Sequence, residues 1–244
     1  MDTFNQKLGL NVPEHVAVIL DGNGRCAKKR MMPRTYGHKV GSKVVEDMLT
    51  VVDDLGVKYF TVYAFSTENW KRSQEEVSTL MSILRFYLRD CIKKSMKNNV
   101  RCRVIGRKEE LSDDIVKSIE ELEETTKNNT GLTFTIAINY GGRDEIARAV
   151  KKIAENAKNG QINIEDINEQ MISDSLDTYY MPDPDLLIRT SGEQRLSNYL
   201  PWQLAYTEFY FTDVLWPDFN EEELIKAFEK YNKRERRYGG VKED

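Results

Sequence analysis

The chain has 244 residues, 40% of them hydrophobic and 31% charged, and its 36 Lys and Arg residues against 40 Asp and Glu residues give a formal net charge of −4. This balance predicts a globular protein with a sizeable core, and the mild acidity argues against a general nucleic-acid binder. Three scattered cysteines argue against a disulfide framework and against structural zinc. The sequence has no signal-like apolar core and no stretch near the ~20 apolar residues of a spanning helix, so we expect a cytoplasmic protein.

Short apolar strands alternate with amphipathic helices along the chain. The patterns predict strands at 15–20, 57–64, 101–105, 132–138, 185–189 and 206–211. They predict helices near 37–55, 73–98 and 112–127, after Gly142, and at 221–237. This alternation predicts an α/β fold with a mostly parallel six-stranded sheet flanked by helices. Because no linker or repeat interrupts it, we expect residues 1–244 to form a single domain.

The strongest local signal lies at residues 15–25. The apolar run from Val16 to Leu20 predicts a buried strand that delivers Asp21 into a loop with glycines at 22 and 24, followed by Arg25. Glycine lets the backbone approach a ligand closely, so an acid, a glycine-rich loop and an arginine favour a site for an anion and a metal ion. Taken alone, the stretch is also compatible with an ordinary Asp-Gly turn.

Ligands of open α/β sheets bind beyond the carboxyl ends of the strands, and polar residues gather there in this chain. Arginine presents a planar fork suited to phosphate oxygens, and two separated clusters suggest two phosphorylated groups, with solvated surface charge as the alternative. Asp21 and Glu208 could share Mg²⁺ if the sheet brings them together; a structural Glu208 paired with an arginine is the alternative. The candidate anion ligands are Arg25, Arg34, His38, Arg189 and Arg195.

Several familiar site signatures are absent from the sequence. There is no P-loop, no Gly-x-Gly-x-x-Gly and no Asp-Asp-x-x-Asp repeat of the trans-type prenyl synthases. Asn23 stands where an aspartyl-phosphate phosphatase has its second Asp.

An ordered set of motifs over residues 15–240 resembles the cis-prenyltransferase family, in particular its bacterial undecaprenyl diphosphate synthases. The motifs are Asp-Gly-Asn-Gly-Arg at 21–25, Gly-His-Lys at 37–39, Tyr-Ala-Phe-Ser-Thr-Glu-Asn-Trp at 63–70, Asn-Tyr-Gly-Gly-Arg at 139–143, Asp-Leu-Leu-Ile-Arg-Thr-Ser-Gly-Glu at 185–193, Arg-Leu-Ser-Asn at 195–198, Trp-Pro-Asp-Phe at 216–219 and Arg-Arg-Tyr-Gly-Gly at 236–240.

The resemblance implies an Mg²⁺-dependent enzyme that adds isopentenyl diphosphate units to an allylic diphosphate, typically farnesyl diphosphate. The allylic substrate loses diphosphate at C1, the isopentenyl double bond attacks that carbon, and a proton then leaves C2 to give a cis double bond. Two bound diphosphates agree with two arginine clusters. The growing chain implies a hydrophobic tunnel lined by the helices near 37–55 and 73–98.

The resemblance also implies roles for individual residues. Asp21 would be the metal-linked catalytic carboxylate, with Glu208 sharing the metal, and Asn69 would orient the step that removes the proton. The allylic diphosphate would be held by Gly22, Asn23, Gly24, Arg25, Arg34 and His38, and isopentenyl diphosphate by Arg189, Arg195, Leu196 and Ser197. A mobile substrate-binding segment would contain Ser66, Thr67, Glu68, Trp70 and Arg72.

Further implications concern assembly and product. The family is usually a homodimer, and the C-terminal tail, 236–244, would lie at the dimer interface and complete the partner's diphosphate site. Residues 1–14 would form an extension, and the lipid product would bring the protein to a membrane surface. Ala64 and Leu132 match tunnel-wall positions that influence product length, and the small Ala64 agrees with a long product.

Two residues depart from the family pattern. Cys26 replaces the usual Trp, which would leave room beside the allylic substrate and alter its affinity. Arg107 replaces an acid.

Three alternatives to an undecaprenyl diphosphate synthase remain open at this point: a cis-prenyl synthase with a shorter product, a non-catalytic accessory subunit, and an RNA-binding module using residues 25–39. The intact Asp21 and arginines count against the second, and the net charge and the lack of interleaved aromatic residues count against the third.

Overall fold

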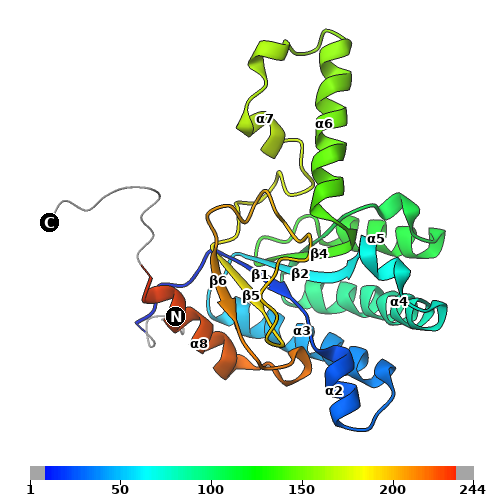
Figure 1. Ribbon diagram of the computed structural model, residues 1–244, viewed down its shortest axis with the longest axis vertical. Coiled ribbons are helices and arrows are strands. Elements are labelled where there is room, and N and C mark those ends of the chain that lie inside the picture. The colour runs from blue at the N-terminus through cyan, green and yellow to red at the C-terminus, as the bar shows by residue number, and fades with distance from the viewer. Residues whose placement is uncertain (1–8, 235–244) are drawn as a thin grey trace, which may run out of the picture. The chain divides into compact units, whose positions relative to one another are not determined.

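The protein's structure is a computed structural model that describes residues 9–234 (Figure 1). Within that range the strands are β1 (His15–Ile19), β2 (Tyr59–Ser66), β3 (Arg101–Ile105), β4 (Thr133–Tyr140), β5 (Leu186–Arg189) and β6 (Glu208–Phe211). The α-helices are α2 (Asn23–Lys29), α3 (Arg34–Asp54), α4 (Gln74–Lys97), α5 (Asp113–Thr126), α6 (Gly142–Lys158), α7 (Glu169–Ser173) and α8 (Glu221–Asn232). Short 3-10 turns include η1 (Thr67–Lys71) and η4 (Trp216–Asp218).

The strands form one six-stranded sheet in the order β3-β4-β2-β1-β5-β6. The pairs β1–β5, β5–β6 and β3–β4 are parallel. The predicted α/β class, with a parallel six-stranded sheet flanked by helices, is therefore confirmed. Parallel pairing of β1 with β5 brings the carboxyl ends of these two strands to the same edge, where sheets of this kind bind ligands.

The described chain divides into two compact units. The first contains residues up to 60, 184–194 and the residues from 203 onward, and the second contains 61–183 and 195–202. The chain passes between them four times, after residues 60, 183, 194 and 202, so no single linker could mark a boundary in the sequence. That the whole chain acts as a single domain stays a prediction.

The first unit is built on β1, β5 and β6. The middle of β1 and of β5 is completely buried, as expected for strands of a parallel sheet covered on both faces. Helices α2 and α3 pack so closely that a Cβ on Gly37 would lie 1.9 Å from the carbonyl oxygen of Asn23. Buried Trp216 fastens η4 to α3, because its indole nitrogen donates to the carbonyl of Gly41 at 2.8 Å.

The second unit contains β3, β4 and most of β2. Helices α4 and α5 turn Leu84, Leu88, Ile115 and Ile119 inward at helical spacing. Strand β3 is an edge of the sheet, and two of its outward N–H groups, together with that of Gly106 directly after it, donate to side chains. The acceptors are Thr126 for Cys102, Glu123 for Val104 and Asp177 for Gly106, at 3.0, 2.9 and 3.0 Å.

The predicted bounds of the elements are close to the observed bounds, with the following differences. Helix α4 begins after Ser73, whose hydroxyl accepts from the N–H of Glu76 at 3.3 Å, as the capping spacing predicted. Helices α2 and α7 were not predicted, because seven and five residues are too few for a visible helical period. Helix α3 begins at Arg34 instead of residue 37, directly after Pro33. Among the described residues, no helix is long and apolar enough to cross a membrane.

Candidate functional site

Asp21 lies two residues beyond β1, in the loop that leads into α2. Its backbone is held by hydrogen bonds from two other segments of the first unit. The Thr190 hydroxyl donates to the carbonyl oxygen of Asp21 at 2.6 Å and accepts from its N–H at 3.0 Å. The N–H of Trp216 donates to the same carbonyl at 2.9 Å. Gly22 then turns the chain at φ 107°, a conformation that side chains rarely allow.

Two arginines face the carboxylate of Asp21. Nη2 of Arg189 donates to Oδ2 at 3.1 Å, and Nη2 of Arg25 lies 3.6 Å from Oδ1. The Arg189 side chain is 4% exposed, whereas those of Asp21 and Arg25 are 31% and 49% exposed. About half of the Arg25 side chain and a third of the Asp21 side chain are therefore exposed beside an arginine that is buried.

The residues after β5 hold Arg25 in place. Its Nη1 donates to the carbonyl of Ser191 at 2.7 Å, its Nη2 donates to the Ser191 hydroxyl, and the carboxylate of Glu193 lies 3.3 Å away. Ser191 adopts a left-handed backbone conformation with φ 75°. The ends of β1 and β5 thus build one cluster of opposite charges.

Arg34 and His38, at the start of α3, belong to the same unit. A Cβ on Gly24 would meet Nε of Arg34 at 2.9 Å, so the missing side chain at Gly24 lets this guanidinium lie against the loop. His38 follows Gly37, whose contact with Asn23 fixes this turn of α3 beside α2. The structure therefore gathers the predicted residues Asp21, Gly22, Asn23, Gly24, Arg25, Arg34 and Arg189 in the first unit.

Cys26 is completely buried in α2. A guanidinium nitrogen of Arg30 donates to its sulfur, and Arg30 also pairs with Asp218. The small side chain therefore leaves room that Arg30 fills from one side. Whether the substitution alters substrate affinity stays a prediction.

Glu208 and Asp21 lie at opposite ends of their strands. Glu208 is level with Leu186 of β5, which is level with Val16 of β1, five residues before Asp21. At about 3.3 Å per residue this is roughly 16 Å along the strands, in addition to the width of two strand spacings. The carboxylate of Glu208 instead accepts from Arg234. The two carboxylates expected to share a metal are therefore not brought together within one chain.

A second group of predicted residues lies in the other unit, at the end of β2. The N–H of Ser66 donates to Oδ1 of Asn69 at 3.1 Å, and this capping box shapes η1. Burial alone would raise the pKa of Glu68, but hydrogen bonds from its own backbone, Asn198, Ser66 and Thr67 outweigh burial and lower it. Arg72 pairs with Glu76 at 2.8 Å, at the start of α4.

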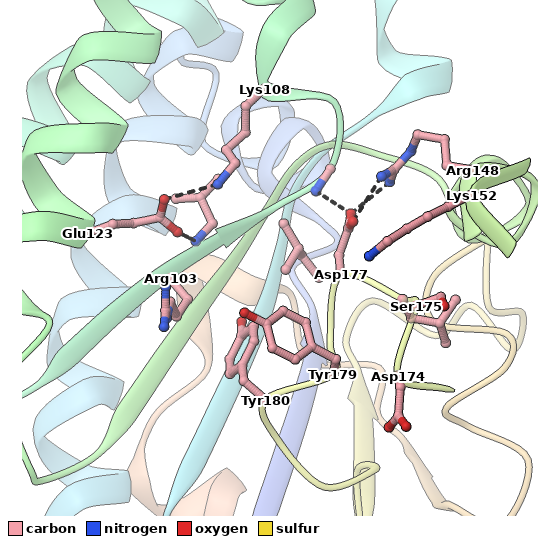
Figure 2. A pocket seen from close by; sticks show the side chains of 14 residues that line it. Arg103, Lys108, Glu123, Arg148, Lys152, Asp174, Ser175, Asp177, Tyr179 and Tyr180 are labelled. Carbon is pink, nitrogen blue, oxygen red and sulfur yellow. Dashed lines mark hydrogen bonds and ion pairs between the residues drawn. The ribbon is translucent and has the colours of Figure 1, made fainter. Parts of the chain in front are cut away.

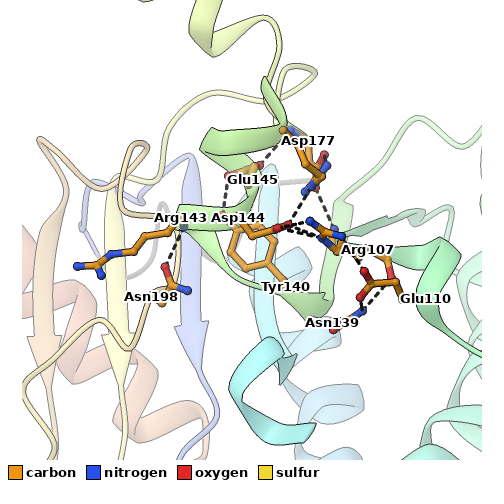
Figure 3. A network of polar contacts seen from close by, with 11 residues as sticks. Arg107, Glu110, Asn139, Tyr140, Arg143, Asp144, Glu145, Asp177 and Asn198 are labelled. Carbon is orange, nitrogen blue, oxygen red and sulfur yellow. Dashed lines mark hydrogen bonds and ion pairs between the residues drawn. The ribbon is translucent and has the colours of Figure 1, made fainter. Parts of the chain in front are cut away.

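The residues Arg195, Leu196 and Ser197 lie near that segment. The amide of Asn198 donates to Glu68 at 3.1 Å, and its side-chain and main-chain oxygens accept from the N–H groups of Arg143 and Gly142 at 2.9 and 2.7 Å. Figure 3 shows Asn198 beside Arg143 at the start of α6. Ser197 and Asn198 both have positive φ, so the chain folds back sharply here. Asn198 thus links two predicted substrate-binding segments.

A polar network crosses the same unit (Figure 3). Arg107 binds Asp144 at 2.6 Å and Glu110 at 2.7 Å, and Arg148 joins Asp144 to Asp177. The pKa of Asp144 is lowered chiefly by Arg107. Arg107, for which the sequence offered no role, is therefore paired with two acids.

A cavity of about 570 Å³ lies beside β3 in this unit (Figure 2). Its walls carry charges that pair with each other: Lys108 lies 3.0 Å from Glu123, and Arg148 lies 2.7 Å from Asp177. None of the residues predicted for the site lines it.

Sequence reasoning did not assign a role to Thr190, Asn139 or Asn198. Thr190 directly follows β5 and Asn139 is the last residue but one of β4, so their positions were a usable signal. Asn198 carried no such signal, because its role depends on contacts with residues far away in the sequence.

The donors at Asp21 suit a hard divalent cation. Mg²⁺ is commonly held by one or two carboxylates, with water and substrate phosphate oxygens completing its octahedron. The partly exposed carboxylate of Asp21 could supply one such ligand. Over residues 9–234, no three His, Cys, Asp or Glu side chains cluster in a way that could hold a metal ion.

Comparisons with known proteins agree with this arrangement. Residues 19–239 match the family described as "Putative undecaprenyl diphosphate synthase". The chain is 53% identical to an isoprenyl transferase from Fusobacterium nucleatum, over 95% of this chain and 98% of that protein. It is 52% identical to an isoprenyl transferase from Streptococcus mutans, over 94% of each.

Two solved structures are also similar. Lavandulyl diphosphate synthase from Lavandula x intermedia, in complex with dimethylallyl diphosphate, has a TM-score of 0.91 and 38% identity, covering 93% of this chain and 98% of that one. A "probable undecaprenyl diphosphate synthase" from Campylobacter jejuni has a TM-score of 0.79 and 33% identity, covering 94% and 100%.

Proposed function

Because the chain belongs to the undecaprenyl diphosphate synthase family of prenyltransferases, we propose that it condenses isopentenyl diphosphate with farnesyl diphosphate to make undecaprenyl diphosphate, the lipid carrier of cell-wall sugars. The chain is a prenyltransferase enzyme of the isoprenyl transferase type. The substrates and the product length are the parts that we propose.

One observation carries the proposal: at a strand end, the partly exposed carboxylate of Asp21 lies 3.1 Å from buried Arg189 and 3.6 Å from half-exposed Arg25. Ionisation of an allylic diphosphate moves negative charge onto the leaving diphosphate. Fixed cations that face this group stabilise the developing charge without having to reorganise.

The residues divide between the two substrates. Arg25, Arg34, His38 and the backbone of Gly22 to Gly24 would bind the allylic diphosphate, and Arg189, Arg195 and Ser197 would bind isopentenyl diphosphate. The C1–oxygen bond breaks with its electron pair on diphosphate, the isopentenyl double bond forms the new carbon–carbon bond, and C2 gives up a proton. Asn69 would orient the group that accepts that proton, since a neutral amide is a poor base.

Asp21 would hold Mg²⁺, which when bound neutralises charge on the diphosphates. The strand register separates Glu208 from Asp21 within one chain, which supports a role for Glu208 in the site of a second copy. We therefore propose a homodimer in which Asp21 of one copy and Glu208 of the other serve one site. The tail 236–244, predicted to complete the partner's site, lies outside the described residues.

The tunnel and its wall positions Ala64 and Leu132 also stay proposals. A long apolar product would carry the protein to a membrane surface. The similarity to a lavandulyl diphosphate synthase keeps a shorter product as the second candidate, although the identity to isoprenyl transferases is higher.

The proposal is tested by incubating the protein with farnesyl diphosphate, labelled isopentenyl diphosphate and Mg²⁺, and measuring product size by chromatography. We expect a C55 product and no turnover after chelation by EDTA, with activity restored by added Mg²⁺. Discrete shorter products would favour the second candidate, and no incorporation at all would refute the proposal.

A further inference from the structure

Segment Ser66–Lys71 is short, and Glu68, Trp70 and Lys71 in it are exposed. A single 3-10 turn of this kind gains little stability from its own hydrogen bonds. Contacts with other elements must therefore keep it in one conformation. The most directional of these contacts involves Trp70.

The indole of Trp70 donates from Nε1 to Oδ1 of Asn139 at 2.8 Å. Its ring also stands edge-on against buried Phe65, with centroids 5.0 Å apart and an interplanar angle of 73°. The Phe65 contact comes from β2 itself, whereas Asn139 is at the end of β4. The hydrogen bond therefore ties the segment to a different strand.

Asn139 is held more firmly than the segment that it binds. It is 1% exposed, and its amide nitrogen donates to the carbonyl of Arg107 at 3.0 Å and to Glu110 at 3.1 Å. The N–H of Arg107 donates back to the Asn139 carbonyl at 3.1 Å. These acceptors fix which way the amide points, so Oδ1 is presented to Trp70. Asn139 has φ 49°, which asparagine tolerates better than most residues.

Arg107 and Glu110 are themselves fixed by the network of Figure 3. Arg107 binds Glu110 at 2.7 Å and Asp144 at 2.6 Å, which connects the Asn139 amide to the start of α6. Removing one member would loosen the others, since hydrogen bonds of this kind act together.

We propose that Asn139 is a positioning residue that, through the Trp70 indole, holds Ser66–Lys71 in its substrate-binding conformation. This inference rests on the proposed function for the identity of the substrate. The hydrogen bond between Trp70 and Asn139, called the latch below, rests on the contacts described above. Without the latch, the segment would populate other conformations. Apparent affinity falls by the fraction of molecules in the competent conformation, whereas a saturating substrate restores that conformation.

The most direct test is Trp70→Phe, which keeps a ring against Phe65 and removes only the indole donor. Loss of one neutral hydrogen bond corresponds to about a 3- to 10-fold change. We expect amide exchange at 66–72 to accelerate by that factor and KM for farnesyl diphosphate to rise by at most that factor, with kcat within about twofold. Trp202→Phe is the matched control, because its indole donates to Ser173 at 3.0 Å in the same unit. It should change neither quantity.

A pair of substitutions that exchanges an amide and a carboxylate tests Asn139 without altering Trp70. Asn139→Asp removes the donor toward Glu110 and sets two carboxylates against each other, so it should raise KM at least as much as Trp70→Phe. Adding Glu110→Gln reverses the direction of that hydrogen bond and should restore part of the loss. A merely destabilising substitution would not be rescued in this way.

The outcomes separate the latch from the proposed function. Parental exchange and parental KM in Trp70→Phe would overturn the latch. If the parent protein does not turn over farnesyl diphosphate, the proposed function fails, and amide exchange alone decides whether the latch exists.

Discussion

Arg189, the last residue of β5, lies 3.1 Å from Asp21, two residues beyond the neighbouring parallel strand β1, and the two side chains are 4% and 31% exposed. The buried guanidinium is the fixed partner, and the carboxylate is the part that a ligand can reach. Opposite charges held in this way give the strand end a defined geometry before any substrate arrives.

Asp21→Ala should reduce turnover by roughly a thousandfold, on the scale of losing a fixed electrostatic group at a reacting centre. We expect the protein to remain folded, because the carboxylate is partly exposed and the loop backbone keeps its bonds to Thr190 and Trp216. Steady-state kinetics and thermal unfolding measure the two effects. Asp47→Ala, at an exposed α3 carboxylate, is the control and should leave turnover unchanged.

Thr190→Val should destabilise the fold by about 0.5–1.5 kcal/mol, because it removes the hydrogen bonds of a completely buried hydroxyl to the N–H and carbonyl of Asp21. The same change should lower turnover by freeing the Asp21 loop. Thr190→Ser keeps the hydroxyl and should retain most of both properties. Equal urea midpoints for the parent and the valine variant would contradict the role given to this hydroxyl.

Cys26→Trp should change KM for farnesyl diphosphate. The larger ring must displace the Arg30 guanidinium that contacts the Cys26 sulfur, and so shift the start of α2 and the loop before it. Filling a completely buried position also costs about 1–3 kcal/mol of stability. Cys26→Ala controls for loss of the thiol and should behave like the parent. Identical kinetics of the Trp variant and the parent would argue against any link between this position and the allylic substrate.

Mixing Asp21→Ala and Glu208→Ala chains should restore turnover if each site takes these residues from different copies. A mixed dimer then contains one intact site and one that lacks both carboxylates. With differently tagged chains, the purified mixed dimer is expected to reach about half the parental rate. A mixed dimer as inactive as the Asp21→Ala homodimer would refute the shared site.

Acid should weaken the contacts of Glu68 before it unfolds the protein. The folded state lowers the pKa of Glu68 below its usual 4.5, so its stabilising contribution is complete above pH 4.5 and declines as the pH falls toward the folded value. The difference in melting temperature between the parent and Glu68→Gln should therefore be constant near neutral pH and shrink below pH 4.5. A difference independent of pH would contradict this assignment.

The sequence predicts the strands and long helices well because burial dominates them. The runs at Val16 to Ile19 and Leu186 to Ile188 are buried in the sheet, and α4 follows an uninterrupted helical stripe. It predicts less well where distant segments meet. Strand alternation indicates that Glu208 is in a strand, but only the pairing register shows that it begins β6, level with Leu186.

The residues of the candidate site likewise divide into those that the sequence predicts and those that depend on distant contacts. Asp21, Arg25 and Arg189 could be predicted, because each one follows or ends an apolar strand. The supporting residues could not be assigned, because Thr190 and Asn198 act through partners 169 and 130 positions away. The residues that neighbour Thr190 and Asn198 in the sequence give no indication of these distant contacts.

The capped edge of β3 limits how copies of this protein can associate. Thr126, Glu123 and Asp177 occupy amides that another strand would need for continuing the sheet. Lateral growth into fibres is thereby discouraged on that side, and any symmetric pairing of two molecules has to rely on side-chain packing or on a different border.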